Sequence, residues 1–114
     1  MARMNIHRGD VVTGVLSGEF GKARPAIVLQ ADLFNATHAS VTVCPVTSHL
    51  LAAPLFRVSL SPRAGTGLKI ESQAMVDKLS TVRLDRLGTI IGQLEADDLE
   101  RVESAVMLWL GLRA

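Results

Sequence analysis

The stretch DVVTGVLSGEFGKARPAIVLQ, residues 10–30, sets the fold class. Its first part, residues 10–16, is short and rich in β-branched side chains, which predicts a strand. Residues 17–23 (SGEFGKA) hold two glycines and several charged or small polar side chains, which predicts a loop. Pro25 then opens a second predicted strand over residues 26–30, because proline is tolerated at a strand's first residue, where no ladder donor is needed.

Four more strands are predicted further along the chain. They cover residues 40–45, 55–60, 72–78 and 89–94, and residues 61–68 (SPRAGTGL) form a turn-rich connection. Six short strands with no long helix between them cannot be parallel, because parallel neighbours need long crossover connections. We therefore expect a mainly β (α+β) protein, with a strongly bent antiparallel sheet that forms a partly open barrel.

Helical patterns are confined to one turn over residues 31–35 (ADLFN) and to the end of the chain. Asp97 is suited to cap the terminal helix, with Glu100 three residues later as in a capping box. One apolar stripe at helical spacing consists of Leu99, Val102, Val106, Trp109 and Leu110. The opposite side carries Asp98, Arg101 and Glu103. We expect this helix to pack on the sheet, with Trp109 in the core.

The chain has 114 residues, which makes one domain the default expectation. We assign residues 1–5 to a loose leader and residues 6–114 to a single domain. Cys44, the only cysteine, excludes an intrachain disulfide and fits a reducing compartment. No stretch has the pattern of an export signal or is long and apolar enough to span a bilayer, so we expect a cytoplasmic protein with no membrane partner.

The charge balance limits the classes of partner. Twelve basic and 11 acidic residues give a formal net charge of +1, which lacks the strongly basic character of a duplex DNA binder. Binding to nucleic acid would therefore depend on a local cluster of cations. The three histidines, His7, His38 and His49, are scattered, and no spacing predicts a metal site or another cofactor. Cys44 lies on an apolar strand and is expected to be a buried, inert thiol.

Two local features point to chemistry. Arg24 follows a glycine-rich loop, and its guanidinium presents a fixed fork of donors that suits a phosphate. Thr47 and Ser48 place two adjacent hydroxyls at the end of an apolar strand, and His49 follows them. Each feature also has a structural interpretation: a surface arginine in the first case, and turn capping by the hydroxyls in the second.

Together with other segments, these features resemble the MazF/PemK-like toxin family. RGDVV (8–12), RPAIVLQ (24–30), VTVCPVTS (41–48), GLKIESQAMVDKLSTV (67–82) and RLGTIIGQLEADDLERVESAV (86–106) follow one another at family-like distances, and LWLGL (108–112) closes the chain. The resemblance implies an SH3-like barrel of the kind shared with CcdB-like toxins, a homodimer, and sequence-specific cleavage of single-stranded RNA without a metal or other cofactor.

The resemblance also implies roles for individual residues. Arg24 matches the arginine that stabilises the transition-state phosphate, Thr47 matches the threonine that orients the site, and Glu19 has the spacing of a proposed base. The candidate RNA-binding residues are Ser48, Asp77, Lys78, Lys22 and His49. A cognate antitoxin, MazE-like with an acidic disordered tail, is the implied protein partner.

The chemistry asked of such a site is consistent with these residues. RNA carries its own nucleophile, the 2′-hydroxyl, so the protein removes that proton, stabilises charge on the phosphate and protonates the leaving 5′-oxygen. Arg24 supplies positive charge, and Glu19 is suited to take the proton. The product would be a 2′,3′-cyclic phosphate and a 5′-hydroxyl, and the general acid stays unassigned.

Two alternatives remain at this point. A CcdB-like DNA gyrase poison would share the barrel and the dimer but cleave nothing, and Arg24 and Thr47 within their motifs favour the ribonuclease. A non-catalytic SH3-like module would need an aromatic groove for proline-rich ligands. A chain with one tryptophan and no tyrosine lacks such a groove.

Overall fold

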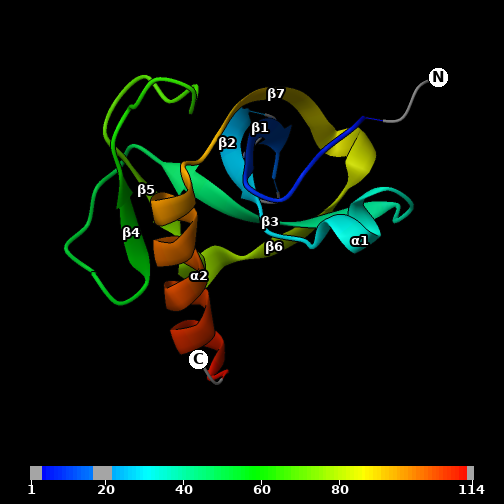
Figure 1. Ribbon diagram of the computed structural model, residues 1–114. Helices are drawn as coiled ribbons and strands as arrows, with labels where there is room; N and C mark the ends of the chain where they lie inside the picture. Colours follow the sequence, from blue (N-terminus) through cyan, green and yellow to red (C-terminus); the bar gives the residue numbers. More distant parts are fainter. Residues whose placement is uncertain (1–3, 17–21, 113–114) are drawn as a thin grey trace.

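The computed structural model describes residues 4–16 and 22–112, and its centre is one antiparallel sheet (Figure 1). The sheet has seven strands in the order β4-β5-β3-β2-β1-β7, and β6 pairs with β3 beside this path. The strands are β1 (Asp10–Val15), β2 (Ala23–Val28), β3 (Ser40–Thr47), β4 (Arg57–Leu60), β5 (Ser72–Met75), β6 (Ser80–Arg83) and β7 (Leu87–Gln93). The predicted fold class, a mainly β protein with an open antiparallel sheet and a C-terminal helix, is confirmed.

Two α-helices and two 3₁₀ turns complete the structure. They are α1 (Asp32–Asn35), α2 (Ala96–Leu110), η1 (Val76–Lys78) and η2 (Leu84–Arg86). In the described part of the chain, no helix is both long and apolar enough to cross a membrane.

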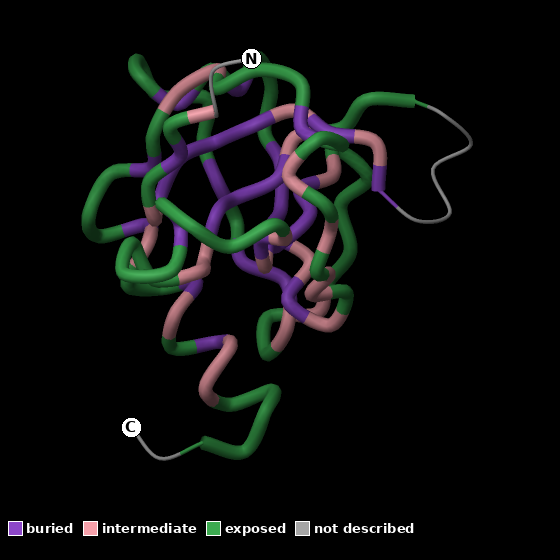
Figure 2. Tube along the Cα trace, turned by 90° about the vertical axis from the view of Figure 1, so that its right-hand side faces the viewer, coloured by how far each residue is buried: buried purple, intermediate pink, exposed green. Residues whose placement is uncertain are grey.

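Apolar side chains fill both faces of the bent sheet, because the strands alternate with a period of two. In β2, Ile27 belongs to one buried cluster, whereas Ala26 and Val28 belong to another. The first cluster also contains Val102 and Ala105 of α2, so this helix covers one face of the sheet. Figure 2 shows the buried strands at the centre of the molecule and the exposed end of α2 beyond them.

The strand prediction was wrong in two places. Residues 72–78 do not form one strand, because η1 interrupts the extended backbone after Met75 and a seventh strand, β6, follows. Pro25 is not the first residue of its strand, since β2 begins at Ala23. Pro25 is tolerated there because β2 pairs with β3 only from Ala26 onward. No backbone N–H is therefore needed from Pro25 to bond to β3.

The terminal helix also differs from its prediction. Its N-cap is Glu95, and no side chain caps it, so the capping box of Asp97 and Glu100 is wrong. Asp98 was expected on the polar side but is buried, because it pairs with arginine side chains beneath the first turn. Trp109 is 49% exposed rather than a core residue, although its ring lies 5.7 Å from that of Phe56.

Candidate functional site

Two prolines create the gap in which the candidate site lies. Pro45 pairs with Ala26 in the last rung of the β2–β3 ladder. Beyond this rung β3 pairs with β5 instead, through Val46 and Thr47. The first residues of β2, including Arg24 and Pro25, pair only with β1. Because proline has no N–H to donate, the two strands separate at this point, and Arg24 and Thr47 line the space between them.

The space is a cavity of about 390 Å³. Strands β1, β2, β3, β5 and β7, the residue after β3 and the connection before β5 supply its lining: Thr13, Ala23, Arg24, Pro25, Val46, Thr47, Ser48, Gly67, Leu68, Lys69, Ile70, Ser72 and Ile91. The described lining thus holds the cation Arg24, the side chain of Lys69 at its rim and four hydroxyls, and no carboxylate. Charges of one sign in a cleft with low-dielectric walls attract the opposite charge, so the cavity is suited to bind an anion.

The hydroxyl of Thr47 has a structural role as well as a place in the cavity. Its Oγ1 accepts a hydrogen bond of 3.0 Å from the backbone N–H of His49, so the turn-capping interpretation is confirmed for this residue. The oxygen of Thr47 is thereby fixed, while its O–H is still able to donate to a ligand. Ser48 follows it with an exposed side chain that lines the same cavity.

The other predicted site residues are not in the cavity lining. Lys22 and His49 are exposed, and each is next in sequence to a lining residue, Ala23 or Ser48. Asp77 and Lys78 lie together on η1, with 3.6 Å between the Lys78 Nζ and the Asp77 Oδ2. Glu19 lies outside the described residues.

Asp77 is instead close enough to Cys44 of β3 for its charge to act on the thiol. Burial, together with the charge of Asp77, raises the pKa of the Cys44 thiol to about 12. The thiol is therefore protonated at neutral pH and inert, as its place on an apolar strand predicted. No group of three or more His, Cys, Asp or Glu residues that could hold a metal ion occurs among the described residues.

Sequence reasoning missed the wall that residues 67–70 contribute to the cavity. Two glycines allow this segment to lie directly on β7. Gly67 has a φ of +76°, and a Cβ there would overlap the carbonyl of Ile91. A Cβ at Gly92 would overlap the backbone of Gly65 and Thr66. From sequence alone the glycines in residues 61–68 indicate only turns, because their contact with β7 depends on the three-dimensional fold.

Comparisons with known proteins point to one family over nearly the whole chain. A family model described as "PemK-like, MazF-like toxin of type II toxin-antitoxin system" matches residues 7–110. A probable endoribonuclease MazF of Mycolicibacterium smegmatis is 40% identical over 94% of this chain and 98% of its own length. Endoribonuclease MazF9 of Mycobacterium tuberculosis is 33% identical over 82% of this chain and 83% of its own length.

Solved structures of MazF proteins share this fold. A crystal structure of MazE-MazF from Deinococcus radiodurans superposes with a TM-score of 0.79 and 25% identity, covering 96% of this chain and all of that one. These matches are MazF proteins, and they lend no support to the CcdB-like alternative. The chain therefore belongs to the PemK-like, MazF-like toxin family of type II toxin–antitoxin systems.

Proposed function

We propose that this endoribonuclease of the MazF-like family cuts single-stranded RNA at defined sequences without a metal ion, in the cavity between β2 and β3. One observation carries the proposal: Arg24 of β2, Thr47 at the end of β3 and Ser48 directly after it line the same cavity, and no described residue lining it is acidic. Such a site binds a phosphate through a guanidinium and hydroxyls, and requires no metal to supply positive charge.

The reaction is an internal transesterification. The 2′-oxygen of the RNA loses its proton and forms a bond to the phosphorus, the bond from phosphorus to the 5′-oxygen breaks, and that oxygen gains a proton. Arg24 stabilises the charge that builds on the phosphoryl oxygens, and Thr47 donates a hydrogen bond to one of them. Glu19 takes the proton from the 2′-hydroxyl. The products are a 2′,3′-cyclic phosphate and a 5′-hydroxyl.

The RNA on either side of the cut site extends along the approaches to the cavity. Lys22 and His49 are exposed where the strand would enter or leave. Ser48 binds inside the cavity, and Asp77 and Lys78 act from η1 at a greater distance from the reacting phosphate. The protein would cut RNA in the cytoplasm, where bacterial RNA is made and translated.

The proposed protein partner is an antitoxin with an acidic tail. The D. radiodurans relative was crystallised as a MazE-MazF pair. In the present chain, the cationic cavity around Arg24 offers a site where carboxylates of such a tail would replace the RNA phosphate. The tail would thus inhibit cleavage by occupying the substrate site.

The functional unit is proposed to be a homodimer. Large apolar side chains near the end of α2 are more than half exposed, among them Leu108 and Leu110. Leu108 also lines a second cavity, of about 410 Å³, together with Leu55 beside the edge strand β4. Apolar surface of this kind is typical of an interface between chains.

Cleavage of a long single-stranded RNA in EDTA tests the enzymatic proposal. Wild-type protein should cut at a few defined sites, and Arg24→Ala and Thr47→Ala should each slow cutting by about 10²–10³-fold, as removal of a transition-state donor does elsewhere. Arg83→Ala is the matched control, because Arg83 is 75% exposed and does not line the cavity.

Three results would each change the assignment. If the Arg24→Ala variant still cuts RNA, the catalytic site lies elsewhere in the protein. If EDTA abolishes cutting, the reaction requires a metal ion. Intact RNA with wild-type protein would reject the ribonuclease, and inhibition of DNA gyrase would then be the next activity to measure.

A further inference from the structure

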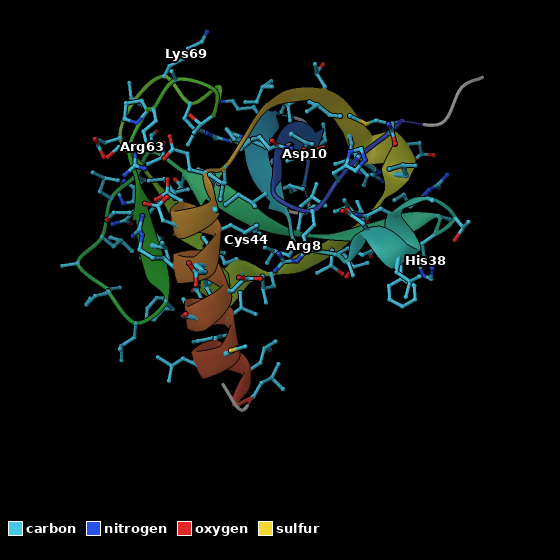
Figure 3. All side chains as sticks on the ribbon, viewed as in Figure 1. Arg8, Asp10, His38, Cys44, Arg63 and Lys69 are labelled. Carbon is cyan, nitrogen blue, oxygen red and sulfur yellow. The ribbon has the colours of Figure 1, made fainter. Side chains whose placement is uncertain are left out.

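The segment from Ser61 to Ile70, within the connection between β4 and β5, contributes one wall of the cavity. Leu68, Lys69 and Ile70 line the cavity together with Arg24 and Thr47. Figure 3 shows Lys69 at the outer edge of the molecule, with its amine extending into solvent. The stem of Lys69 therefore contributes to the rim of the cavity, while its charge stays available outside it.

This wall is held rigidly against the sheet. Thr66 is buried, and its hydroxyl donates to the carbonyl of Arg63 at 2.9 Å and accepts from the N–H of Leu68 at 3.2 Å. The N–H of Gln93 donates to the carbonyl of Gly65 at 2.8 Å. Together with the close approach at Gly67, these bonds fix the backbone that leads directly into Lys69.

Arg63 joins the base of the same segment to the first turn of α2. Its Nη1 donates to the Glu95 Oε2 at 2.6 Å and lies 3.8 Å from the Asp98 Oδ2. The Oδ1 of Asp98 accepts from Arg101 at 2.8 Å, while its Oδ2 is buried with no hydrogen-bond partner among the described residues. The positive charge of Arg63 thus balances a carboxylate that is expensive to bury unpaired.

We propose that Lys69 binds an RNA phosphate next to the one held by Arg24, and that Arg63 with Asp98 is a positioning pair that holds Lys69 at the rim of the cavity. The proposal rests on the ribonuclease function proposed above, and it adds a backbone contact and its support to that site. Lysine acts here as a point charge, so the contact fixes the path of the strand and carries no sequence information.

The experiment measures binding separately from cleavage. A short mixed-sequence RNA with every 2′-hydroxyl methylated lacks the nucleophile, and its affinity for wild-type protein is measured over a range of salt concentrations. Lys69→Gln should weaken binding severalfold and reduce the slope of log K against log salt by about 0.7, the value for one phosphate contact on a single strand. Arg83→Gln, which removes one exposed charge outside the cavity, should leave the slope unchanged.

A double-mutant cycle tests the positioning pair. Arg63→Gln should weaken binding and lower the salt slope in wild-type background, and Arg63→Lys should restore part of both. In the Lys69→Gln background, Arg63→Gln should have no further effect, because it acts through Lys69. A purely structural role for Arg63 would lower the melting temperature and leave the salt slope as in wild type.

The outcomes separate the two proposals. If wild-type protein cuts RNA but Lys69→Gln leaves the slope unchanged, Lys69 is not a phosphate contact and the ribonuclease function stands. If the effects of Arg63→Gln and Lys69→Gln are additive, the positioning role of Arg63 is wrong. If wild-type protein neither cuts RNA nor binds the methylated strand, the proposed function fails and this inference fails with it.

Discussion

At the scale of single residues, the two prolines are as important to the site as the residues that line it. Pro45 closes the β2–β3 ladder and Pro25 precedes it, so the two strands no longer pair with each other where Arg24 and Thr47 lie. The RP pattern thus places Arg24 directly before one of these prolines, and the PVTS pattern places Thr47 two residues after the other. Of the site residues that the family resemblance implies, Arg24, Thr47 and Ser48 line the cavity.

Lys69 could not be predicted in the same way. Its position depends on the contact of Gly67 and Gly92 with backbone that is distant in the sequence. The burial of Asp98 has the same origin, because Arg63 reaches it from another part of the chain. Helical periodicity alone assigned Asp98 to the polar face, since periodicity does not report a charged partner from another element.

Cys44 gives a prediction for the pH dependence of stability. The folded protein holds the thiol proton up to a pKa of about 12, whereas the ordinary value is 9.0. Between these values the native state binds a proton that the unfolded chain has released. The free energy of unfolding should therefore be constant with respect to this group below pH 9 and fall by about 1.4 kcal/mol per pH unit above it.

Denaturant unfolding between pH 7 and pH 11 measures this slope, with Cys44→Ala as the control. The alanine variant should be less stable at pH 7, because it leaves a small cavity in the core, but it should lack the part of the slope that belongs to the thiol. Equal slopes for the two proteins would show that the thiol ionises alike in the folded and unfolded chains.

At the scale of elements, the contact between residues 61–70 and β7 fixes part of the cavity lining against the sheet. Strand β7 closes one side of the sheet against β1, and its backbone also supports the cavity wall. The strands rich in β-branched residues, such as β1 and β3, were predictable because local preference and burial agree in them. Strand β6 could not be predicted in this way. The sequence pattern gives no sign that η1 ends the preceding strand and that a separate strand follows it.

Gly92→Ala tests the support that β7 gives to this wall. A Cβ at this position would overlap the backbone of Gly65 and Thr66, which cannot move aside as a flexible side chain can. We expect a loss of about 1–3 kcal/mol in the free energy of unfolding, as for other overpacked sites. The wall should also shift, which raises the KM for RNA more than it lowers kcat, because Arg24 and Thr47 lie on other strands.

Gly14→Ala is the matched control for that substitution. The nearest atom to its added Cβ would be the end of the Leu87 side chain, at 3.1 Å, which has freedom to adjust. This variant should lose little stability, so a larger loss in Gly92→Ala belongs to the overlap with backbone. If Gly92→Ala keeps the KM of the wild type, the wall does not contribute to RNA binding through its position on β7.

At the scale of the whole molecule, the chain has more apolar residues than its small sheet covers. Apolar residues make up 48% of the sequence. The sheet stays open, with β4 at one end of its strand order, and α2 runs beyond the sheet toward the C-terminus (Figure 1). Leu108, Trp109 and Leu110 are each about half exposed there, so the helix that fills the core at Val102 ends in uncovered apolar surface.

Leu108→Glu tests whether a second copy covers this surface. Wild-type protein should have twice the mass of the single chain in analytical ultracentrifugation, and a charge at Leu108 should shift the equilibrium toward the monomer, because burying an unpaired carboxylate in an interface is unfavourable. Leu33→Glu is the control: Leu33 is 80% exposed on α1, a different element from the proposed interface, and this variant should keep the dimer. If both variants remain dimeric, the interface lies elsewhere, whereas a monomeric wild-type protein would leave the exposed end of α2 for the antitoxin.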